Sequence, residues 1–380
     1  MKSFDVVIVG GGIIGGAIAW ELARRELRVV IIDRHEPWRE ASWAAAGMLS
    51  PSPELSESPR LFALAKASFD LYPEWVSEIE SVAATAPLIR HGSTLELFAG
   101  PEAETARDAF VAQHQRLGLK TKAISPDDAI ILEPTIGSRA RAVALLSDEA
   151  TVDPRALGQA LLQALARRGV EIRTGKEVTS LAIENQRCTG VIAAGRELAA
   201  GHVVVAAGCY SGSIQGIRGY APVHPVRGQM AALWPRAAAP SRVLRSHRGY
   251  VVPRPDGRII AGSTLENEGY EQRVTPSGQM KILGAAIELS PSLADAEIVE
   301  TWSGLRPDTP DHLPIIGSVD GPGGLESVTI ATGHYRNGIL LGPITARLVA
   351  ESIVGEAMSL DTTPFSPLRF ANAAGAAERA

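Results

Sequence analysis

The order of apolar and polar positions predicts a strand, a tight turn and a helix at the start of the chain. Residues 4–9 are apolar and β-branched, which is typical of a strand buried on both faces of a parallel sheet. Apolar residues then recur at helical spacing over 14–22, and a second β-branched run covers 29–32. Strand, helix and strand in this order predict the βαβ unit of an open α/β sheet.

Further patterns predict helices between the strands. We expect an amphipathic helix over 61–79, broken or kinked at Pro73, because proline lacks the N–H that a helix interior needs. Asp153 and Pro154 are typical of an N-cap and a first helical residue, so a second helix should begin there and end near Gly169.

The second half of the chain is rich in predicted strands. Two β-branched runs, 250–254 and 258–264, are joined by a proline–aspartate–glycine turn, which indicates a hairpin. Strand-like patterns extend from 222 to 300, so we expect an α+β unit there. An apolar run ending at Gly333 and a helical pattern over 339–354 should then return the chain to the first sheet.

Together these elements predict an α/β fold with two domains. We expect a Rossmann-like dinucleotide-binding domain and a discontinuous substrate-binding domain built on an antiparallel sheet. The expected cofactor domain comprises residues 1–85, 141–218 and 301–367, the substrate domain comprises 86–140 and 219–300, and 368–380 form a flexible tail.

Gly10, Gly12 and Gly15 form a G-x-G-x-x-G pattern between the first strand and the first helix. In this setting the first glycine permits a tight turn, the second lets a pyrophosphate approach the backbone, and the third lets helix and strand pack closely. The helix N-terminus offers N–H groups to the phosphates. Asp33 follows the second strand, where a carboxylate can accept hydrogen bonds from a ribose. The sequence therefore predicts a dinucleotide site.

Composition and charge narrow the function classes. The 380 residues carry a net charge of −5 and 45% are hydrophobic, so we expect a globular protein that does not bind nucleic acid. Its two cysteines, Cys188 and Cys209, are too few for a disulfide framework or a structural zinc site and favour a reducing compartment. No apolar run is long enough for a membrane span, and the N-terminal pattern differs from that of a signal peptide. We therefore expect a cytoplasmic location.

Two arginines and a tyrosine are the candidate substrate-binding residues. The eight histidines show no metal-ligand spacing, and neither a G-x-S-x-G elbow nor a P-loop is present. Arg306 and Arg336 stand in glycine-rich settings, and arginine binds a planar carboxylate with two parallel hydrogen bonds. Tyr250 could add a phenolic hydroxyl. Spacing alone leaves another interpretation open. The two arginines would then be surface residues, and the tyrosine would be a half-buried residue of a sheet.

These residues, with the small-residue segment 41–49, resemble the D-amino-acid oxidase superfamily of FAD-dependent enzymes. Within it the chain is most similar to glycine oxidases, the flavoenzymes of bacterial thiamine biosynthesis. Taken alone, the small residues would equally suit the start of a well-packed helix. The resemblance rests on the glycine pattern with Asp33, Ser42-x-Ala44-Ala45-Ala46-Gly47-Met48-Leu49, Trp302-x-Gly304-Leu305-Arg306-Pro307 and Gly333-His334-Tyr335-Arg336-Asn337-Gly338-Ile339-Leu340.

The resemblance implies an extended FAD that is bound non-covalently, because neither cysteine lies in a context that matches a flavin-linking one. Asp33 would hold the adenosine ribose and the backbone of Val178 would hold the adenine. Residues 46–48 would face the flavin, and 334–340 would close over its pyrimidine side. The implied FAD-binding residues are Gly10, Gly12, Ile13, Ile14, Gly15, Asp33, Ala41, Ser42, Ala46, Gly47, Met48, Val178, His334, Tyr335, Arg336, Asn337, Gly338, Ile339 and Leu340.

For the substrate, the resemblance implies Arg306 as the main carboxylate clamp, with Tyr250 and Arg336 assisting as further catalytic residues. Leu265 would line the substrate cavity at a position where the glycine-oxidase pattern has a methionine. The residues before Tyr250 differ from that pattern as well. These departures concern the choice of substrate and leave the fold unchanged.

The implied activity is oxidative deamination of glycine, sarcosine and small D-amino acids by a homo-oligomer, expected to be a homotetramer. Molecular oxygen would be the acceptor, the products would be an imine or 2-oxo acid and hydrogen peroxide, and iminoglycine would serve thiamine thiazole synthesis. The alternatives are a D-amino-acid or D-proline dehydrogenase with a quinone or protein acceptor, and a non-catalytic flavoprotein subunit of a complex. An NAD-dependent enzyme is least favoured, because it would not account for the return of 333–340 to the cofactor.

Overall fold

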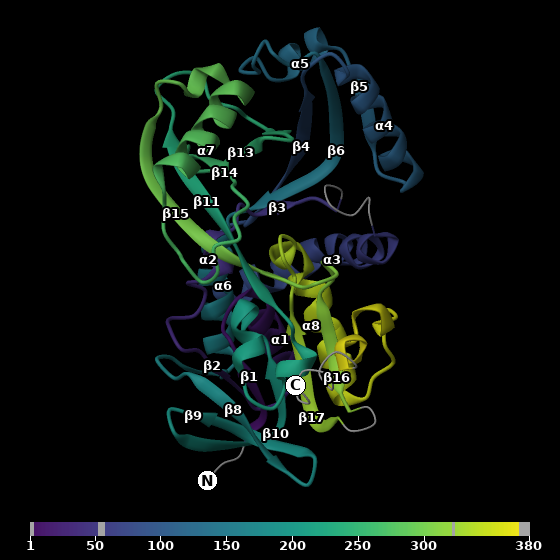
Figure 1. Ribbon diagram of the computed structural model, residues 1–380, viewed down its shortest axis with the longest axis vertical. Helices are drawn as coiled ribbons and strands as arrows, with labels where there is room; N and C mark the ends of the chain where they lie inside the picture. The colour runs from purple at the N-terminus through teal and green to yellow at the C-terminus, as the bar shows by residue number, and fades with distance from the viewer. Residues whose placement is uncertain (1–3, 52–57, 321–323, 372–380) are drawn as a thin grey trace.

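The computed structural model describes residues 4–51, 58–320 and 324–371, which build two sheets arranged along the long axis of the molecule (Figure 1). One half contains an eight-stranded sheet. The other half contains a nine-stranded sheet. A mixed α/β fold with two sheets confirms the predicted fold class.

The eight-stranded sheet is built on the predicted βαβ unit. Five strands run parallel in the order β17, β10, β1, β2 and β7, and β16 pairs antiparallel with β17 outside them. Strands β8 and β9 extend the first half of β10 as an antiparallel ribbon. The strands are β1 (Phe4–Val9), β2 (Val29–Ile32), β7 (Glu171–Arg173), β8 (Val178–Glu184), β9 (Arg187–Ala193), β10 (Arg196–Val205), β16 (Ile315–Val319) and β17 (Leu325–Thr332).

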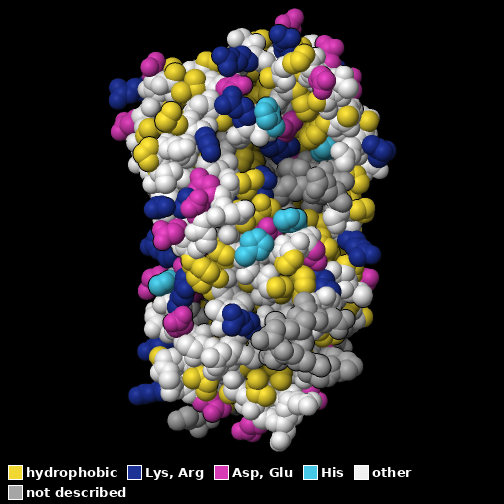
Figure 2. Space-filling view, viewed as in Figure 1, with side chains coloured by type: hydrophobic (Ala, Val, Ile, Leu, Met, Phe, Trp, Pro, Cys, Tyr) yellow, Lys and Arg dark blue, Asp and Glu magenta, His cyan; other side chains and the backbone are white. Residues whose placement is uncertain are grey.

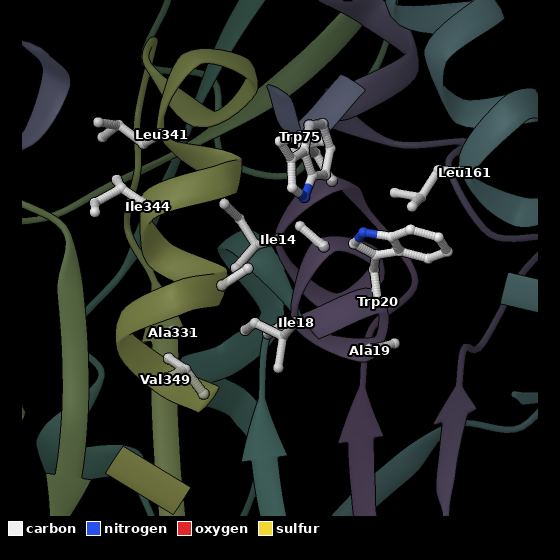
Figure 3. Close-up of a cluster of buried hydrophobic side chains, with 14 of the residues drawn as sticks. Ile14, Ile18, Ala19, Trp20, Trp75, Leu161, Ala331, Leu341, Ile344 and Val349 are labelled. Carbon is white, nitrogen blue, oxygen red and sulfur yellow. The ribbon is translucent and has the colours of Figure 1, made fainter. Parts of the chain in front are cut away.

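Both faces of this sheet are buried, which explains its continuous β-branched runs. Val6 and Ile8 of β1 belong to one apolar cluster and Val7 and Val9 to another. Figure 3 shows the first cluster, in which Ile14 lies between Trp75 and Ile344 of neighbouring helices and Ile18 lies one turn further along the same helix. The helices on this face are α1 (Ile13–Arg24), α3 (Pro59–Ala83), α6 (Pro154–Arg167) and α8 (Gly338–Val354).

The nine-stranded sheet is mostly antiparallel, and among its described strands β12 and β4 are the one parallel pair. Its order is β15, β11, β14, β13, β12, β4, β6 and β3, with β5 also paired to β6. The strands are β3 (Met48–Leu49), β4 (Ile89–Phe98), β5 (Thr121–Ile124), β6 (Ala142–Val152), β11 (His224–Trp234), β12 (Val243–Ser246), β13 (Gly249–Pro253), β14 (Ile259–Gly262) and β15 (Glu297–Asp308). The predicted hairpin over 250–264 is confirmed by the pairing of β13 with β14.

Alternate residues on this sheet face opposite environments. Ala231, Val251 and Ala261 pack against helix α7 (Pro276–Leu289), whereas Met230 and Tyr250 belong to a cluster that includes Ala44 and Trp302. The period of two therefore directs one set of side chains outward to α7 and the other inward to the cofactor half. The remaining helical segments are α2 (Ala41–Ala44), α4 (Ala103–Arg116), α5 (Pro126–Leu132), η2 (Gly208–Ser213), η3 (Arg218–Tyr220), η4 (Pro291–Leu293), η5 (Thr363–Phe365) and η6 (Pro367–Phe370).

The predicted caps hold for α6, where the Asp153 carboxylate accepts from the N–H groups of Arg155 and Ala156, and Gly169 follows with φ of +77°. Helix α3 runs from Pro59 to Ala83 without interruption, so a break at Pro73 is wrong, and the alternative of a kink there stays a prediction. A proline in a helix interior costs about 3 kcal/mol, because it removes a hydrogen bond and its ring clashes with the preceding turn, and packing along a helix of about seven turns can outweigh this cost. Helix α7 was not predicted, because the pattern of residues 222–300 indicated mainly strands.

The division into domains stays a prediction. Strands β6 and β15 lie in the nine-stranded sheet, although 141–218 and 301–367 were assigned to the cofactor domain. The first residues of the expected tail, 368–370, belong to η6, where Arg369 pairs with Asp311 at 2.8 Å. Residues 372–380 lie outside the described residues.

The surface carries charges of both signs. On the face seen in Figure 2, lysine and arginine side chains are interspersed with aspartate and glutamate. Among the described helices, none combines the length and apolar character that a bilayer crossing needs.

Candidate active site

A cavity of about 370 Å³ lies between the two sheets and is lined by residues from both. Gly10, Gly12 and Asp33 line one end, and Tyr250 and Arg306 line the other. The volume falls within the range of small-molecule sites, about 300–1,000 Å³. The predicted dinucleotide fingerprint and the predicted carboxylate clamp therefore share one cavity.

The glycine fingerprint is required by backbone contacts. Gly10 has φ of +104°, and a Cβ on it would lie 2.5 Å from the Ala206 carbonyl oxygen. A Cβ on Gly15 would lie 1.9 Å from the Gly10 carbonyl oxygen. Gly15 does not line the cavity, so its role is the close packing of α1 on the turn, as the pattern implies. Gly11 and Gly12 form the cavity wall itself.

The first turn of α1 and Asp33 lie at the end of the cavity that is expected to hold the ribose and the phosphates. The Asp33 carboxylate accepts from the N–H of Gly11 at 2.7 Å and from that of His35 at 2.9 Å. Burial raises the pKa of Asp33, and these two donors act in the opposite direction. Each oxygen keeps a further lone pair for a ligand hydroxyl. The Ser42 hydroxyl accepts from the N–H of Ile13 at 2.9 Å, so this side chain caps α1 beside the cavity.

The turn expected to face the flavin leads into β3 and is held by side chains from more distant parts of the nine-stranded sheet. Gly47 has φ of +73°, and a Cβ on it would lie 2.0 Å from the Val152 carbonyl oxygen. The buried Arg254 guanidinium donates to the carbonyl of Ala46 at 2.7 Å, and the Trp302 indole donates to the carbonyl of Ala44 at 3.1 Å. Sequence reasoning missed Arg254, whose only signal is an arginine among the apolar residues of a hairpin.

The C-terminal motif also reaches the cavity. Residues 334–339 line it, whereas Leu340 does not: its carbonyl accepts from the Ser68 hydroxyl at 2.6 Å in the core. His334 is buried against the Thr345 hydroxyl at 3.0 Å, and burial lowers its pKa to about 3, so the imidazole is neutral. The N-terminus of α8 follows directly, and its positive end favours negative charge in the cavity.

The Arg306 side chain extends from β15 over the neighbouring strand β11 and not into solvent. Its guanidinium donates to the Ser263 hydroxyl at 2.8 Å and to the Thr264 carbonyl at 3.2 Å. A Cβ on Gly228 would lie 2.1 Å from Arg306 Nη1, so only glycine leaves room for this position. The pairing of Gly228 with Gly304 brings this small residue beneath the guanidinium. Sequence reasoning missed Gly228, because its role depends on the register of β11 against β15.

Tyr250 lies on the same face of the sheet. It is buried, and its hydroxyl lies 3.5 Å from the Met230 sulfur, over Gly262 of the next strand. Arg336 and Val178 line the cavity, as does Leu265, whose side chain is 55% exposed. All predicted site residues therefore line one cavity except Gly15 and Leu340.

FAD fits this arrangement. Gly11 and Gly12 leave a backbone wall where a side chain would stand, since added Cβ atoms would lie 2.8 Å from Pro37 and 3.0 Å from Ser42. Asp33 offers acceptors, α1 and α8 both point their N-termini at the cavity, and the far end is apolar and arginine-lined. Both cysteines are free and buried, and burial raises the pKa of Cys209 to about 12, so its thiolate is disfavoured.

Comparisons with known proteins agree with this reading. The family model "DAO: FAD dependent oxidoreductase" matches residues 5–352. Glycine oxidase of Pseudomonas putida is 35% identical over 96% of this chain and 98% of its own. The bifunctional protein ThiO/ThiG of Synechocystis is 35% identical over 96% of this chain and 54% of its own, longer chain. The crystal structure of glycine oxidase from Geobacillus kaustophilus matches with a TM-score of 0.90 and 30% identity, over 96% of this chain and 98% of that one.

The full-length match in sequence and fold agrees with the cavity that joins a dinucleotide fingerprint to an arginine clamp. The chain belongs to the DAO family of FAD-dependent oxidoreductases and is an FAD-dependent amino-acid oxidase similar to glycine oxidases.

Proposed function

We propose that the enzyme oxidises glycine, sarcosine and small D-amino acids to the imine, with molecular oxygen as the electron acceptor and hydrogen peroxide as a product. The imine then hydrolyses to the 2-oxo acid. The observation that carries the proposal is Arg306, which is fixed over Gly228 in the cavity that also contains the glycine fingerprint. A fixed guanidinium is suited to a planar carboxylate.

The residues of the chain orient the substrate and set its charge. Arg306 is anchored by Ser263 and Thr264, so it can receive the substrate carboxylate without losing further rotamer freedom. Tyr250 and Arg336 line the same end and assist it. FAD, when bound, supplies the hydride acceptor for the substrate Cα–H. Among the described residues that line this end of the cavity there is no aspartate or glutamate, so we propose that the amine loses its proton before oxidation without a carboxylate base.

The small side chains around the substrate end support a small amino acid. Gly228 and Gly304 are a cross-strand pair that lines the cavity beside Arg306. Met230 and Tyr250 line the cavity next to them. Leu265 borders the mouth with an exposed side chain and would contact larger substituents. We also propose that the imine from glycine serves thiamine thiazole synthesis, which the fused ThiO/ThiG relative supports. The homotetrameric state and cytoplasmic location stay predictions.

The test is oxygen uptake by the purified flavoprotein with glycine, sarcosine, D-alanine and D-proline in parallel. The proposal predicts rapid uptake with stoichiometric peroxide on one or more of the first three. Flavin bleaching without oxygen uptake would contradict oxygen as the acceptor and support the dehydrogenase alternative. No bleaching by any of the four would contradict the substrate class.

A further inference from the structure

The chain between β14 and α7 extends from the substrate end of the cavity to the cofactor end. Residues 263–275, which we call the crossing segment, connect these two elements. The first of them, Ser263, lines the substrate end and holds the clamp arginine. Further along the segment, Tyr270 and Gln272 contact residues of the cofactor half. The crossing segment therefore joins the two ends of one cavity.

The two ends of the crossing segment are fixed on β11. The buried Arg227 guanidinium donates to the Glu266 carboxylate at 2.6 Å, and these two residues also exchange backbone hydrogen bonds. The Gln229 side chain donates to the Thr275 hydroxyl at 3.0 Å and accepts from the Thr275 N–H at 2.8 Å. The middle of the segment, which contains Tyr270, is held by other contacts.

Tyr270 makes two contacts with the wall of the cofactor end. Its ring stacks on the Tyr210 ring, with 5.1 Å between the centroids and 28° between the planes. Its hydroxyl donates to the carbonyl oxygen of Cys209 at 3.0 Å. Tyr210 and Cys209 line the cavity, whereas Tyr270 does not, so Tyr270 supports this wall from behind. Sequence reasoning did not single out either tyrosine.

The stack continues to Arg34. The Arg34 guanidinium lies 3.4 Å from the centroid of the Tyr210 ring and pairs with the Glu40 carboxylate at 2.9 Å. Gln272 donates to the other oxygen of this carboxylate at 2.8 Å. Arg34 and Glu40 line the cavity, and Arg34 follows Asp33 directly in the chain. Two side chains of the crossing segment therefore support the cavity wall beside the expected ribose site.

These contacts order the wall before a ligand arrives. Tyr270 is 53% exposed and is no member of the described apolar clusters, so the cores of both halves do not depend on it. A ligand loses affinity when its binding must order side chains, and a wall already held in its bound conformation avoids that cost. Aromatic stacking and a cation–π contact are each comparable in strength with the ordering cost of one side chain.

We propose that the crossing segment retains FAD, with Tyr270 as a positioning residue that acts through Tyr210 and Arg34. Tyr270 holds the wall of the cofactor end in the conformation that binds FAD, and Gln272 assists through Glu40. The affinity for the cofactor is then set partly by a segment of the substrate half. This role is independent of which amino acid the enzyme oxidises.

Titration of the apoprotein with FAD tests the proposal. Flavin is removed from the purified protein and added back, and the flavin fluorescence gives the dissociation constant. We expect this constant to rise by about tenfold or more in Tyr270→Ala, which loses both the stack and the hydrogen bond. Tyr270→Phe keeps the stack and loses only the hydrogen bond, so the rise should be about threefold. Gln272→Ala loses one exposed hydrogen bond and should give a rise of about threefold or less.

Asn267→Ala is the matched control. Asn267 is an exposed polar residue of the same crossing segment, and its side chain has no hydrogen-bond partner among the described residues. The dissociation constant of this variant should equal that of the wild type.

Thermal unfolding with and without FAD separates this role from a purely structural one. Added FAD raises Tm by an amount that depends on the dissociation constant. We expect the apoproteins of Tyr270→Ala and the wild type to unfold at nearly the same temperature, and the rise with FAD to be smaller in the variant. A Tm that is lowered equally with and without FAD, at an unchanged dissociation constant, would overturn the proposal.

The graded variants keep the test decisive. A dissociation constant of Tyr270→Ala within about twofold of the wild type would overturn the proposal, because loss of a stacked aromatic pair alone should cost more than that. Should Tyr270→Ala fail to fold, Tyr270→Phe and Gln272→Ala decide the question, and wild-type constants in both would overturn it.

Discussion

The two ends of the cavity are built in different ways. At the cofactor end, the chain presents backbone atoms, and glycines are required because any Cβ would meet a carbonyl oxygen, as at Gly10 and Gly15. At the substrate end, side chains from four strands meet on one face of a sheet, and Arg306 holds its place through Gly228 on another strand. The first end depends on local sequence, whereas the second depends on register between distant segments.

The largest effect is expected at the cofactor end. Gly15→Ala would bring a Cβ within 1.9 Å of the Gly10 carbonyl oxygen, so the turn and α1 cannot both keep their positions. We expect purified protein without flavin, measured as the ratio of absorbance at the flavin and protein bands. Gly284→Ala is the control, because a Cβ there meets nothing within 4 Å. Full flavin content in Gly15→Ala would contradict the packing role of this glycine.

A substitution at the substrate end should lower activity without lowering flavin content. Gly228→Ala would place a Cβ 2.1 Å from Arg306 Nη1 and displace the guanidinium. Displacement by about 1 Å can cost about 100-fold in rate, so kcat/KM for sarcosine should fall by about that factor. Flavin content should stay at the wild-type level, because Gly228 lies in the nine-stranded sheet. A joint loss of flavin and activity would show that the two ends are not independent.

A smaller effect concerns the pH dependence of stability. Burial lowers the pKa of His334 to about 3, so at pH 5 an unfolded chain binds a proton there and the folded chain does not. Stability from this group is complete above its ordinary pKa of 6.5 and is lost as the pH falls toward 3. The slope from this group approaches about 1.4 kcal/mol per pH unit.

Urea unfolding between pH 7.5 and pH 5 measures that slope. His334→Asn should lower the slope, and His91→Asn, at an exposed position, should leave it unchanged. An equal slope in the wild type and His334→Asn would show that His334 is not held neutral by burial.

The same contrast explains what the sequence could predict. The fingerprint, Asp33 and the Asp153 cap were predictable because each acts within a few residues of its partners or in a recognisable βαβ setting. Helix α7 was missed although its signal is present, since Thr275 precedes Pro276 and Ile282, Ala286 and Leu289 follow at helical spacing. The hairpin signals of the region favoured strands there.

Gly228 and Arg254 could not be predicted in the same way. Gly228 matters because β11 pairs with β15 in one register, and Arg254 because a hairpin reaches across to Ala46. Each role arises from strand pairing across tens or hundreds of residues, which residue patterns do not encode locally.

The most direct test of the account is anaerobic flavin reduction by sarcosine in Arg306→Ala, compared with the wild type over a range of substrate concentrations. Removing the clamp should cost a few kcal/mol of substrate binding, so catalytic efficiency should fall by at least about 30-fold. Flavin content should be unchanged, because the groups that would hold FAD lie at the other end of the cavity. Reduction with an efficiency within about threefold of the wild type would contradict the assignment of Arg306, given that loss of a charged partner costs about 2–5 kcal/mol.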